Sequence, residues 1–176
     1  FATLTNVNFD PARFEDKIRE AARIRDALPP AGSAEPDACT WTPESQAAIA
    51  AKAEEIVAAR EMVDADLQSL RDLLVFGLKG MGAYYHHASV LGYRDEEITT
   101  FLQEGLAATL HDHTADEMVT LVLKCGEIGV KTLALLDRAN TAAFGTPEIT
   151  TVSTGAGTRP GILVTGHDLK DLADLL

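Results

Sequence analysis

The sequence predicts a mainly α-helical protein, in which antiparallel three-helix bundles precede a short strand, turn and helix that begin an α/β domain. Three observations predict this fold class. Apolar residues recur at helical spacing over most of residues 10–143. An aspartate or a threonine stands where each of these stretches begins, as expected of helix N-caps. After Pro147 the helical spacing ends, and a short β-branched run follows at residues 162–164.

These changes in pattern also predict the domain organisation. Residues 1–147 are expected to form a helical-bundle domain, made of a partial first bundle over 1–63 and a three-helix bundle over 64–143. Residues 148–160 are expected to be a linker, and residues 161–176 the first strand and helix start of an α/β domain. A βαβ unit needs about 30 residues, so this second domain is expected to be incomplete. The first residue is Phe rather than Met, which favours a trimmed chain.

Two helices are predicted in the first 63 residues. Asp10-Pro11 pairs a capping side chain with a proline at the first helical position, and the helix should end before Pro29-Pro30. Residues 29–39 are rich in proline, alanine and glycine and predict a loop. Thr42-Pro43 repeats the cap and proline pattern and is expected to begin an alanine-rich helix that continues through Arg60.

The longest apolar helix is predicted to begin near Asp64 or Asp66 and to end at Leu91, where Gly92 suits a left-handed cap. It contains three interior glycines, each of which costs about 0.5–1 kcal/mol relative to alanine. Tight packing inside the bundle is the favoured explanation, and close approach of a partner domain is the alternative. The three are Gly77, Gly80 and Gly82.

Two further helices complete the predicted bundle. Asp95 is expected to cap a shorter helix. Residues 114–117 form a capping box, in which Thr114 and Glu117 each bind the other's backbone amide. The helix that follows should reach about Asn140 and be closed by Gly145-Thr146-Pro147. Short connections between these helices predict antiparallel neighbours.

Composition and charge narrow the class of partner. The 176 residues are 46% hydrophobic and 24% charged, which is ordinary for a globular chain with a buried core. The net charge of −12 argues against nucleic acid and against an anionic membrane surface. No run reaches the roughly 20 apolar residues that span a bilayer. Cys39 and Cys125 lie far apart, which disfavours a disulfide scaffold and favours a reducing, cytoplasmic location.

The stretch that most resembles a functional site is residues 161–172. Residues 162–164 predict a buried strand, Gly166 ends it, and Asp168 can cap a helix. His167 is expected at the turn between them, where the backbone would hold an imidazole that still faces outward. It could be a metal ligand, with its second ring nitrogen oriented by a neighbour. The alternative is a histidine that forms only local hydrogen bonds at a helix start.

Other histidines and glycines are less promising. The pair in His111-Asp112-His113 lacks an evident third ligand, so a solvated loop is the better interpretation. His86-His87 are adjacent on a helix and point about 100° apart, so one should face the core and the other solvent. Gly155-Ala156-Gly157 precedes the expected strand instead of following it, which indicates a linker rather than a phosphate cradle.

The cysteines and carboxylates suggest little chemistry by themselves. Cys125 falls on an apolar helix stripe and is expected to be a small buried side chain, and Cys39 has no flanking cation and receives no role. Two cysteines cannot complete a cubane cluster, which usually takes four thiolates. No pair of carboxylates stands in an apolar setting, so no catalytic residue is assigned.

Residues 161–172 resemble the segment of the hybrid cluster protein family, also known as prismane proteins or hydroxylamine reductases, that supplies a histidine ligand to the cluster. Other parts of the chain resemble the same family in the same order. They are residues 1–6, 69–74 with 77–80, 116–119 and 135–141.

The resemblance implies a helical domain followed by two α/β domains. It also implies a hybrid iron–sulfur–oxygen cluster and a cysteine-ligated iron–sulfur cluster in the parent protein. Of the family's cluster ligands, His167 alone matches, so it is the expected metal and cofactor-binding residue. The remaining cysteine and glutamate ligands would lie outside this chain. We therefore expect this chain by itself to bind no cluster and to be inactive.

The implied activity is reduction of hydroxylamine, or of nitric oxide, with electrons from a redox donor. Two alternatives remain open at this point. One is a non-enzymatic helical scaffold or interaction module, whose exposed apolar surface would lead to self-association. The other is a relative of carbon monoxide dehydrogenase, which shares the general architecture.

Overall fold

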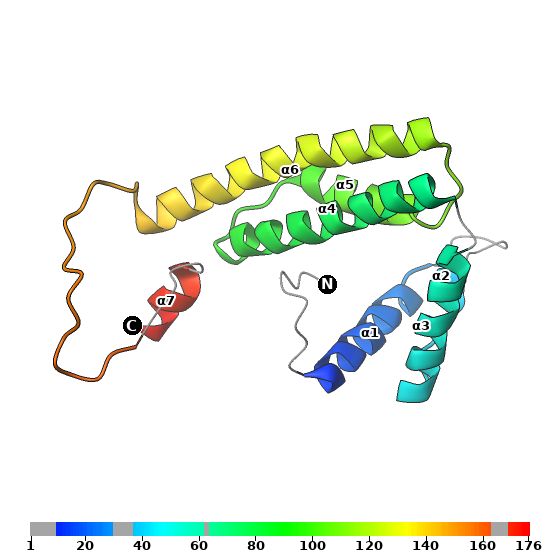
Figure 1. Cartoon of the computed structure of the whole chain (residues 1–176), viewed down its shortest axis with the longest axis horizontal. Helices are drawn as coiled ribbons and strands as arrows, with labels where there is room; N and C mark the ends of the chain where they lie inside the picture. Colours follow the sequence, from blue (N-terminus) through cyan, green and yellow to red (C-terminus); the bar gives the residue numbers. More distant parts are fainter. Residues whose placement is uncertain (1–9, 30–36, 62–63, 163–168) are drawn as a thin grey trace.

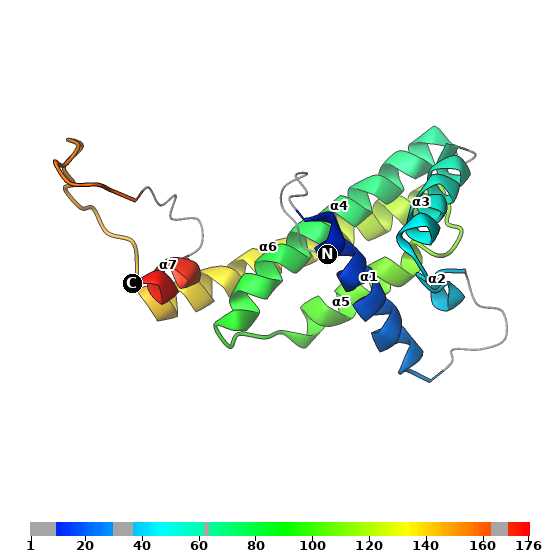
Figure 2. The same ribbon diagram turned by 90° about the horizontal axis from the view of Figure 1, so that it is seen from below.

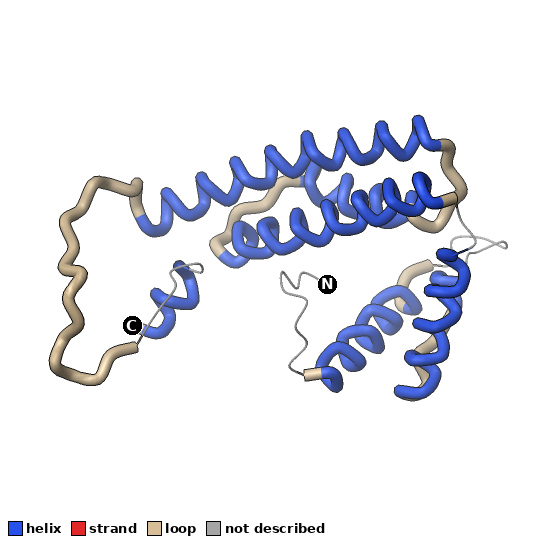
Figure 3. Tube along the Cα trace, viewed as in Figure 1, coloured by secondary structure: helices blue, strands red, loops and turns tan. Residues whose placement is uncertain are grey.

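A computed structural model describes residues 10–29, 37–61, 64–162 and 169–176. Within these ranges the chain forms seven helices and no strand, which confirms the mainly α-helical fold (Figures 1 and 3). The expected strand at residues 162–164 falls mostly outside the described residues, and Ile162 itself is in no regular structure. The helices are α1 (Pro11–Asp26), α2 (Asp37–Thr40), α3 (Gln46–Glu61), α4 (Ala65–Val90), α5 (Glu96–Ala108), α6 (Ala115–Phe144) and α7 (Leu169–Leu175).

Helix α1 begins where its capping pattern predicts. The Asp10 carboxylate accepts a hydrogen bond from the amide of Arg13 at 3.2 Å. At the other end of α1, the Arg25 guanidinium donates to the carbonyl oxygens of Ala38 (3.2 Å) and Trp41 (2.6 Å). These bonds connect α1 to the short helix α2, although none of the described residues of α1 is buried.

The predicted start of α3 is wrong by three residues. The helix begins at Gln46, and the Ser45 hydroxyl accepts a hydrogen bond from the amide of Ala48 at 3.1 Å. Residues 41–44 form no regular structure, and the Glu44 amide donates to the Thr42 carbonyl oxygen at 3.0 Å instead of beginning a helix there. Helix α2 was not predicted either: residues 37–39 lie within the stretch that indicated a loop, and that prediction is wrong for these three residues.

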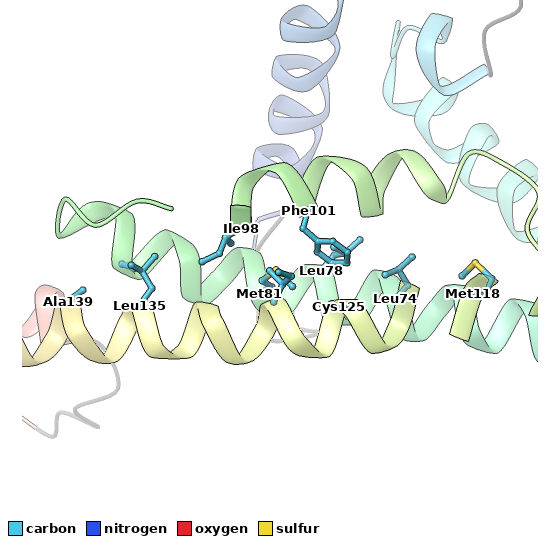
Figure 4. Close-up of a cluster of buried hydrophobic side chains, with 11 residues drawn as sticks. Leu74, Leu78, Met81, Ile98, Phe101, Met118, Cys125, Leu135 and Ala139 are labelled. Atoms are coloured by element: carbon cyan, nitrogen blue, oxygen red, sulfur yellow. The ribbon is translucent and has the colours of Figure 1, made fainter. Parts of the chain in front are cut away.

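Helices α4, α5 and α6 pack against one another as a three-helix bundle, with α5 antiparallel to its two neighbours (Figure 1). As predicted, α4 is followed by a left-handed glycine, Gly92, at φ +85°. Their interface holds the buried core of the chain, and most of its side chains are labelled in Figure 4. The core residues are Leu74, Leu78, Met81, Ala88, Ile98, Phe101, Met118, Cys125, Ile128, Leu135 and Ala139.

An ion-pair cluster connects the start of α5 to the middle of α6. The Asp95 carboxylate caps α5 by accepting hydrogen bonds from the amides of Glu97 (3.0 Å) and Ile98 (3.3 Å). Lys131 of α6 lies 3.0 Å from the same carboxylate and also pairs with Glu97. The hydrogen bond from Lys131 is the main reason that the pKa of Asp95 is lowered, with the amide bonds adding to it.

The predicted capping box at the start of α6 is confirmed. The Thr114 amide donates to Glu117 Oε2 at 2.8 Å, and the Glu117 amide donates to Thr114 Oγ1 at 3.3 Å. These bonds satisfy backbone donors that would otherwise lack partners at the helix start. Helix α6 then extends to Phe144, a few residues beyond the predicted end, and Gly145 follows it at φ +89°.

Replacing Thr114 with alanine should lower the free energy of unfolding by about 0.5–2 kcal/mol, the usual loss for a removed N-cap. The other half of the capping box, the Glu117 carboxylate, should make the stability depend on pH. The pKa of Glu117 is lowered from 4.5, chiefly by the hydrogen bond from the Thr114 amide. The carboxylate therefore stabilises the fold above about pH 4.5, and this contribution is lost as the pH falls through the lowered pKa.

Urea unfolding of the wild type, Thr114→Ala and Glu117→Gln between pH 3 and pH 7 would measure this dependence. Glu117→Gln should be destabilised at pH 7 and should approach the wild type at the acid end. If the difference in unfolding free energy between the wild type and Glu117→Gln were the same at every pH in this range, the role assigned to the Glu117 carboxylate would be wrong.

Across the described residues, no helix combines the length and the apolar character that crossing a membrane requires.

Candidate functional site

His167 lies outside the described residues, but the helix that follows it is placed. Helix α7 lies beside the ends of α4 and α6 (Figure 2). Side chains of the three helices line a small cavity of about 40 Å³. The lining residues are Tyr84, His87 and Leu91 from α4, Leu136 and Asn140 from α6, and Leu169 and Lys170 from α7. Helix α7 begins two residues after His167, and it lies at this end of the bundle.

The two adjacent histidines of α4 have different surroundings. Their ring centroids are 6.2 Å apart and the planes are inclined by 54°. His86 is exposed, whereas His87 is half-buried and lines the cavity beside α7. This matches the prediction that one ring faces inward and the other faces solvent. Sequence reasoning did not predict that His87 and α7 line one cavity, because this depends on how residues 145–162 bring α7 back to the bundle.

The histidines between α5 and α6 also differ from each other. His111 and Asp112 are exposed, as expected of a solvated loop. His113 is half-buried instead, with Nε2 3.0 Å from the carbonyl oxygen of Ala108 and Nδ1 3.8 Å from the Glu117 carboxylate. The solvated-loop interpretation is therefore wrong for His113, whose ring ties the end of α5 to the start of α6.

Cys125 is a packing residue, as predicted. Its side chain is 6% exposed, and burial raises the pKa of the thiol, which disfavours the reactive thiolate. A Cβ added at Gly77 would lie 2.7 Å from Cys125 Sγ, so close packing within the bundle explains this glycine. The same explanation does not hold for Gly80, where an added Cβ would meet nothing within 4 Å among the described residues.

An open apolar groove of about 460 Å³ runs between α4 and α6. Four of its lining side chains are large and well exposed: Leu73 (55%), Phe76 (64%), Val130 (68%) and Leu133 (49%). Sequence reasoning missed this groove. The available signal was a pair of glycines three residues apart on each helix, at Gly77 and Gly80 and at Gly126 and Gly129.

The described residues do not by themselves fit an iron–sulfur cluster. Among them, no three histidine, cysteine, aspartate or glutamate side chains come together in a way that could hold a metal ion. Cys39 lies in α2 and Cys125 is buried in α6, so the two thiols belong to different parts of the fold. Any cluster associated with this chain would need ligands from outside the described part.

The profile of the Prismane/CO dehydrogenase family matches residues 1–176. The chain belongs to this family. The match confirms the family resemblance that the sequence segments indicated.

Curated relatives within the family include hydroxylamine reductases from several organisms. The chain is 50% identical over 190 residues to that of Nitratidesulfovibrio vulgaris and 46% identical over 178 residues to that of Chlorobaculum tepidum. It is 48% identical over 185 residues to that of Methanosarcina mazei. Each match covers 100% of this chain but 33–34% of the relative, so the chain spans about a third of the length of these proteins.

Proposed function

We propose that the full-length protein containing this chain is a hydroxylamine reductase. The observation that carries the proposal is the identity of 46–50% to hydroxylamine reductases along the whole chain. The reaction converts hydroxylamine, two electrons and two protons into ammonia and water, with cleavage of the N–O bond. Hydroxylamine is the small-molecule substrate, and a redox partner must supply the electrons.

The proposed cofactors are the hybrid iron–sulfur–oxygen cluster and the cysteine-ligated iron–sulfur cluster that the resemblance implies. Within this chain, His167 is the proposed ligand to an iron of the hybrid cluster. A neutral imidazole binds a metal through one nitrogen, while a hydrogen bond to the other fixes its tautomer and orientation. The segment around His167 supports this role through its resemblance to the family's ligand segment. The described residues offer no cluster site, so the other ligands come from elsewhere in the protein.

The proposed location is the cytoplasm. The two cysteines do not form a disulfide in the structure, and a reducing compartment suits a protein that depends on thiolate ligands. The isolated chain is proposed to be inactive, because one histidine is a poor metal site.

The proposal can be tested on protein purified without oxygen. Iron, acid-labile sulfide and the rate of ammonia formation from hydroxylamine would be measured for the full-length protein and for residues 1–176, with a reduced viologen dye as the electron source. The full-length protein should contain both elements and oxidise two dye molecules per ammonia. The 176-residue chain should do neither.

Two outcomes would count against the proposal. A full-length protein that contains iron and sulfide but forms no ammonia would remove hydroxylamine as the substrate. Stoichiometric iron and sulfide in the 176-residue chain would mean that copies of the chain pool ligands such as His167, Cys39 and Cys125.

A further inference from the structure

The groove between α4 and α6 is a surface without an occupant in the described part of the chain. Helix α5 packs against both helices, yet none of the groove's described lining residues belongs to α5. The groove therefore leaves apolar side chains of the bundle facing solvent, among them Phe76 and Val130. Contiguous exposed apolar surface of this kind usually marks an interaction site.

Three of the glycines that line the groove have no explanation within the bundle. A Cβ added at Gly80, Gly126 or Gly129 would meet nothing within 4 Å among the described residues. Glycine in a helix interior costs about 0.5–1 kcal/mol relative to alanine, so these positions weaken α4 and α6 without a local reason.

At two other helical glycines, by contrast, a neighbouring side chain leaves no room for a Cβ atom. An added Cβ would lie 2.7 Å from Cys125 Sγ at Gly77, and 2.8 Å from a Leu78 methyl carbon at Gly105. The remaining glycines of the groove instead leave bare backbone open to the outside. A bare backbone is what permits another main chain to approach closely.

The chemistry and the length of the groove indicate the kind of occupant. Among the described residues that line it, none is charged. A charged or unpaired polar side chain seated there would lose its hydration without gaining a partner, so an apolar surface is required. The α6 side extends from Val122 to Leu133, about 16 Å along the helix axis at 1.5 Å per residue. This length matches about three turns of another helix.

We propose that the groove between α4 and α6 seats one apolar helix from the part of the full-length polypeptide that lies outside this chain. The matched relatives are about three times as long as the chain, so most of the protein is available to supply it. A segment of the same polypeptide also has a high effective concentration, which favours it over a second copy. The seated helix would complete a four-helix arrangement with α4, α5 and α6.

The test uses substitutions that fill the groove without disturbing the bundle. Gly129→Leu places a side chain in the groove, where there is space for it in this chain. Ala134→Leu is the matched control, because Ala134 is exposed on the same helix but does not line the groove. Both variants would be made in residues 1–176 and in the full-length protein. Far-UV circular dichroism should show unchanged helicity for both variants of the 176-residue chain.

Labelling of a thiol introduced by Leu73→Cys reports whether the groove is covered, because Leu73 lines the groove and is 55% exposed in this chain, whereas the buried Cys125 would label slowly in either protein. Leu73→Cys would be added to each protein, and the peptide carrying position 73 would be quantified by mass spectrometry after timed exposure to a maleimide. Labelling should be slower in the full-length protein than in the 176-residue chain by at least about tenfold. Gly129→Leu should remove most of this protection in the full-length protein, and Ala134→Leu should leave it intact.

Equal labelling rates in the two proteins would overturn the proposal, as would full protection that survives Gly129→Leu. A third result would overturn it in favour of a second copy. In that case the 176-residue chain would be a dimer by light scattering, Gly129→Leu would make it monomeric, and labelling of the full-length protein would be as fast as that of the monomer.

Discussion

Replacing Leu78 with alanine should lower the free energy of unfolding of the 176-residue chain by about 2–5 kcal/mol. Leu78 is fully buried at the point where α4, α5 and α6 meet (Figure 4). Its methyl groups lie against Gly105, which has no side chain that could move into the space left behind. The variant therefore loses the burial of three carbon atoms and also retains a cavity. Domains of this kind are stable by about 5–15 kcal/mol, so the loss would be a large fraction of the total.

Urea unfolding followed by far-UV circular dichroism would measure the change. Leu123→Ala is the matched control, because Leu123 belongs to α6 but is 70% exposed, and its removal should change the stability by less than about 0.5 kcal/mol. Equal losses for the two variants would mean that the interface of α4, α5 and α6 is not the stabilising core of the chain.

Replacing His167 with alanine in the full-length protein should lower the rate of hydroxylamine reduction by at least about 100-fold. Loss of a residue that only orients a metal ligand typically lowers metal affinity or activity by about 10–100-fold, and loss of the ligand itself should lower them further. The iron content should fall as well, and the visible spectrum of the cluster should change. Both readouts distinguish a metal ligand from a histidine that merely supports the start of a helix.

His111→Ala provides the control, because His111 is an exposed histidine at a distance in sequence from the proposed site. This variant should keep the iron, the spectrum and the rate of the wild type. If His167→Ala retained its full iron content and spectrum while losing activity, the residue would not be a ligand, and the role proposed for it would have to be abandoned.

The helix boundaries that the sequence predicted correctly are those that depend on local chemistry. Asp10, Asp64, Asp95 and Thr114 each accept hydrogen bonds from backbone amides within three residues of themselves. Such bonds are formed by a short peptide segment and are therefore visible in its sequence. The buried face of α6 was predictable for the same reason, since helical spacing alone placed Cys125 inward.

The features that the sequence did not predict depend either on two capping patterns that compete or on residues that lie far apart in the sequence. Thr42-Pro43 and Ser45 both offer a capping pattern, and the sequence does not indicate which of them begins α3. His113 becomes a structural residue only because the chain reverses between α5 and α6 and brings Ala108 within 3.0 Å of its ring. The groove between α4 and α6 depends in the same way on how two helices separated by α5 are arranged.

The candidate site could be predicted in part. The local pattern around His167 left open whether the residue is a ligand or an ordinary hydrogen-bonded histidine, and the family resemblance favoured the ligand. The cavity that α7 shares with Tyr84, His87 and Asn140 was not predictable, because residues 145–162 form no regular structure from which the path of the chain to α7 could be inferred. The predicted domain limits at residues 63 and 147 stay predictions.

The uneven burial of the helices has a consequence for how the chain opens. None of the described residues of α1 or α3 is buried, whereas α4, α5 and α6 share one apolar interior. Amide hydrogens of α1 and α3 are thus shielded mainly by their own helical turns, while those of the bundle exchange with solvent only when three helices separate together. The polypeptide accordingly behaves as one cooperative unit joined to two helices that can fray and re-form while that unit stays folded.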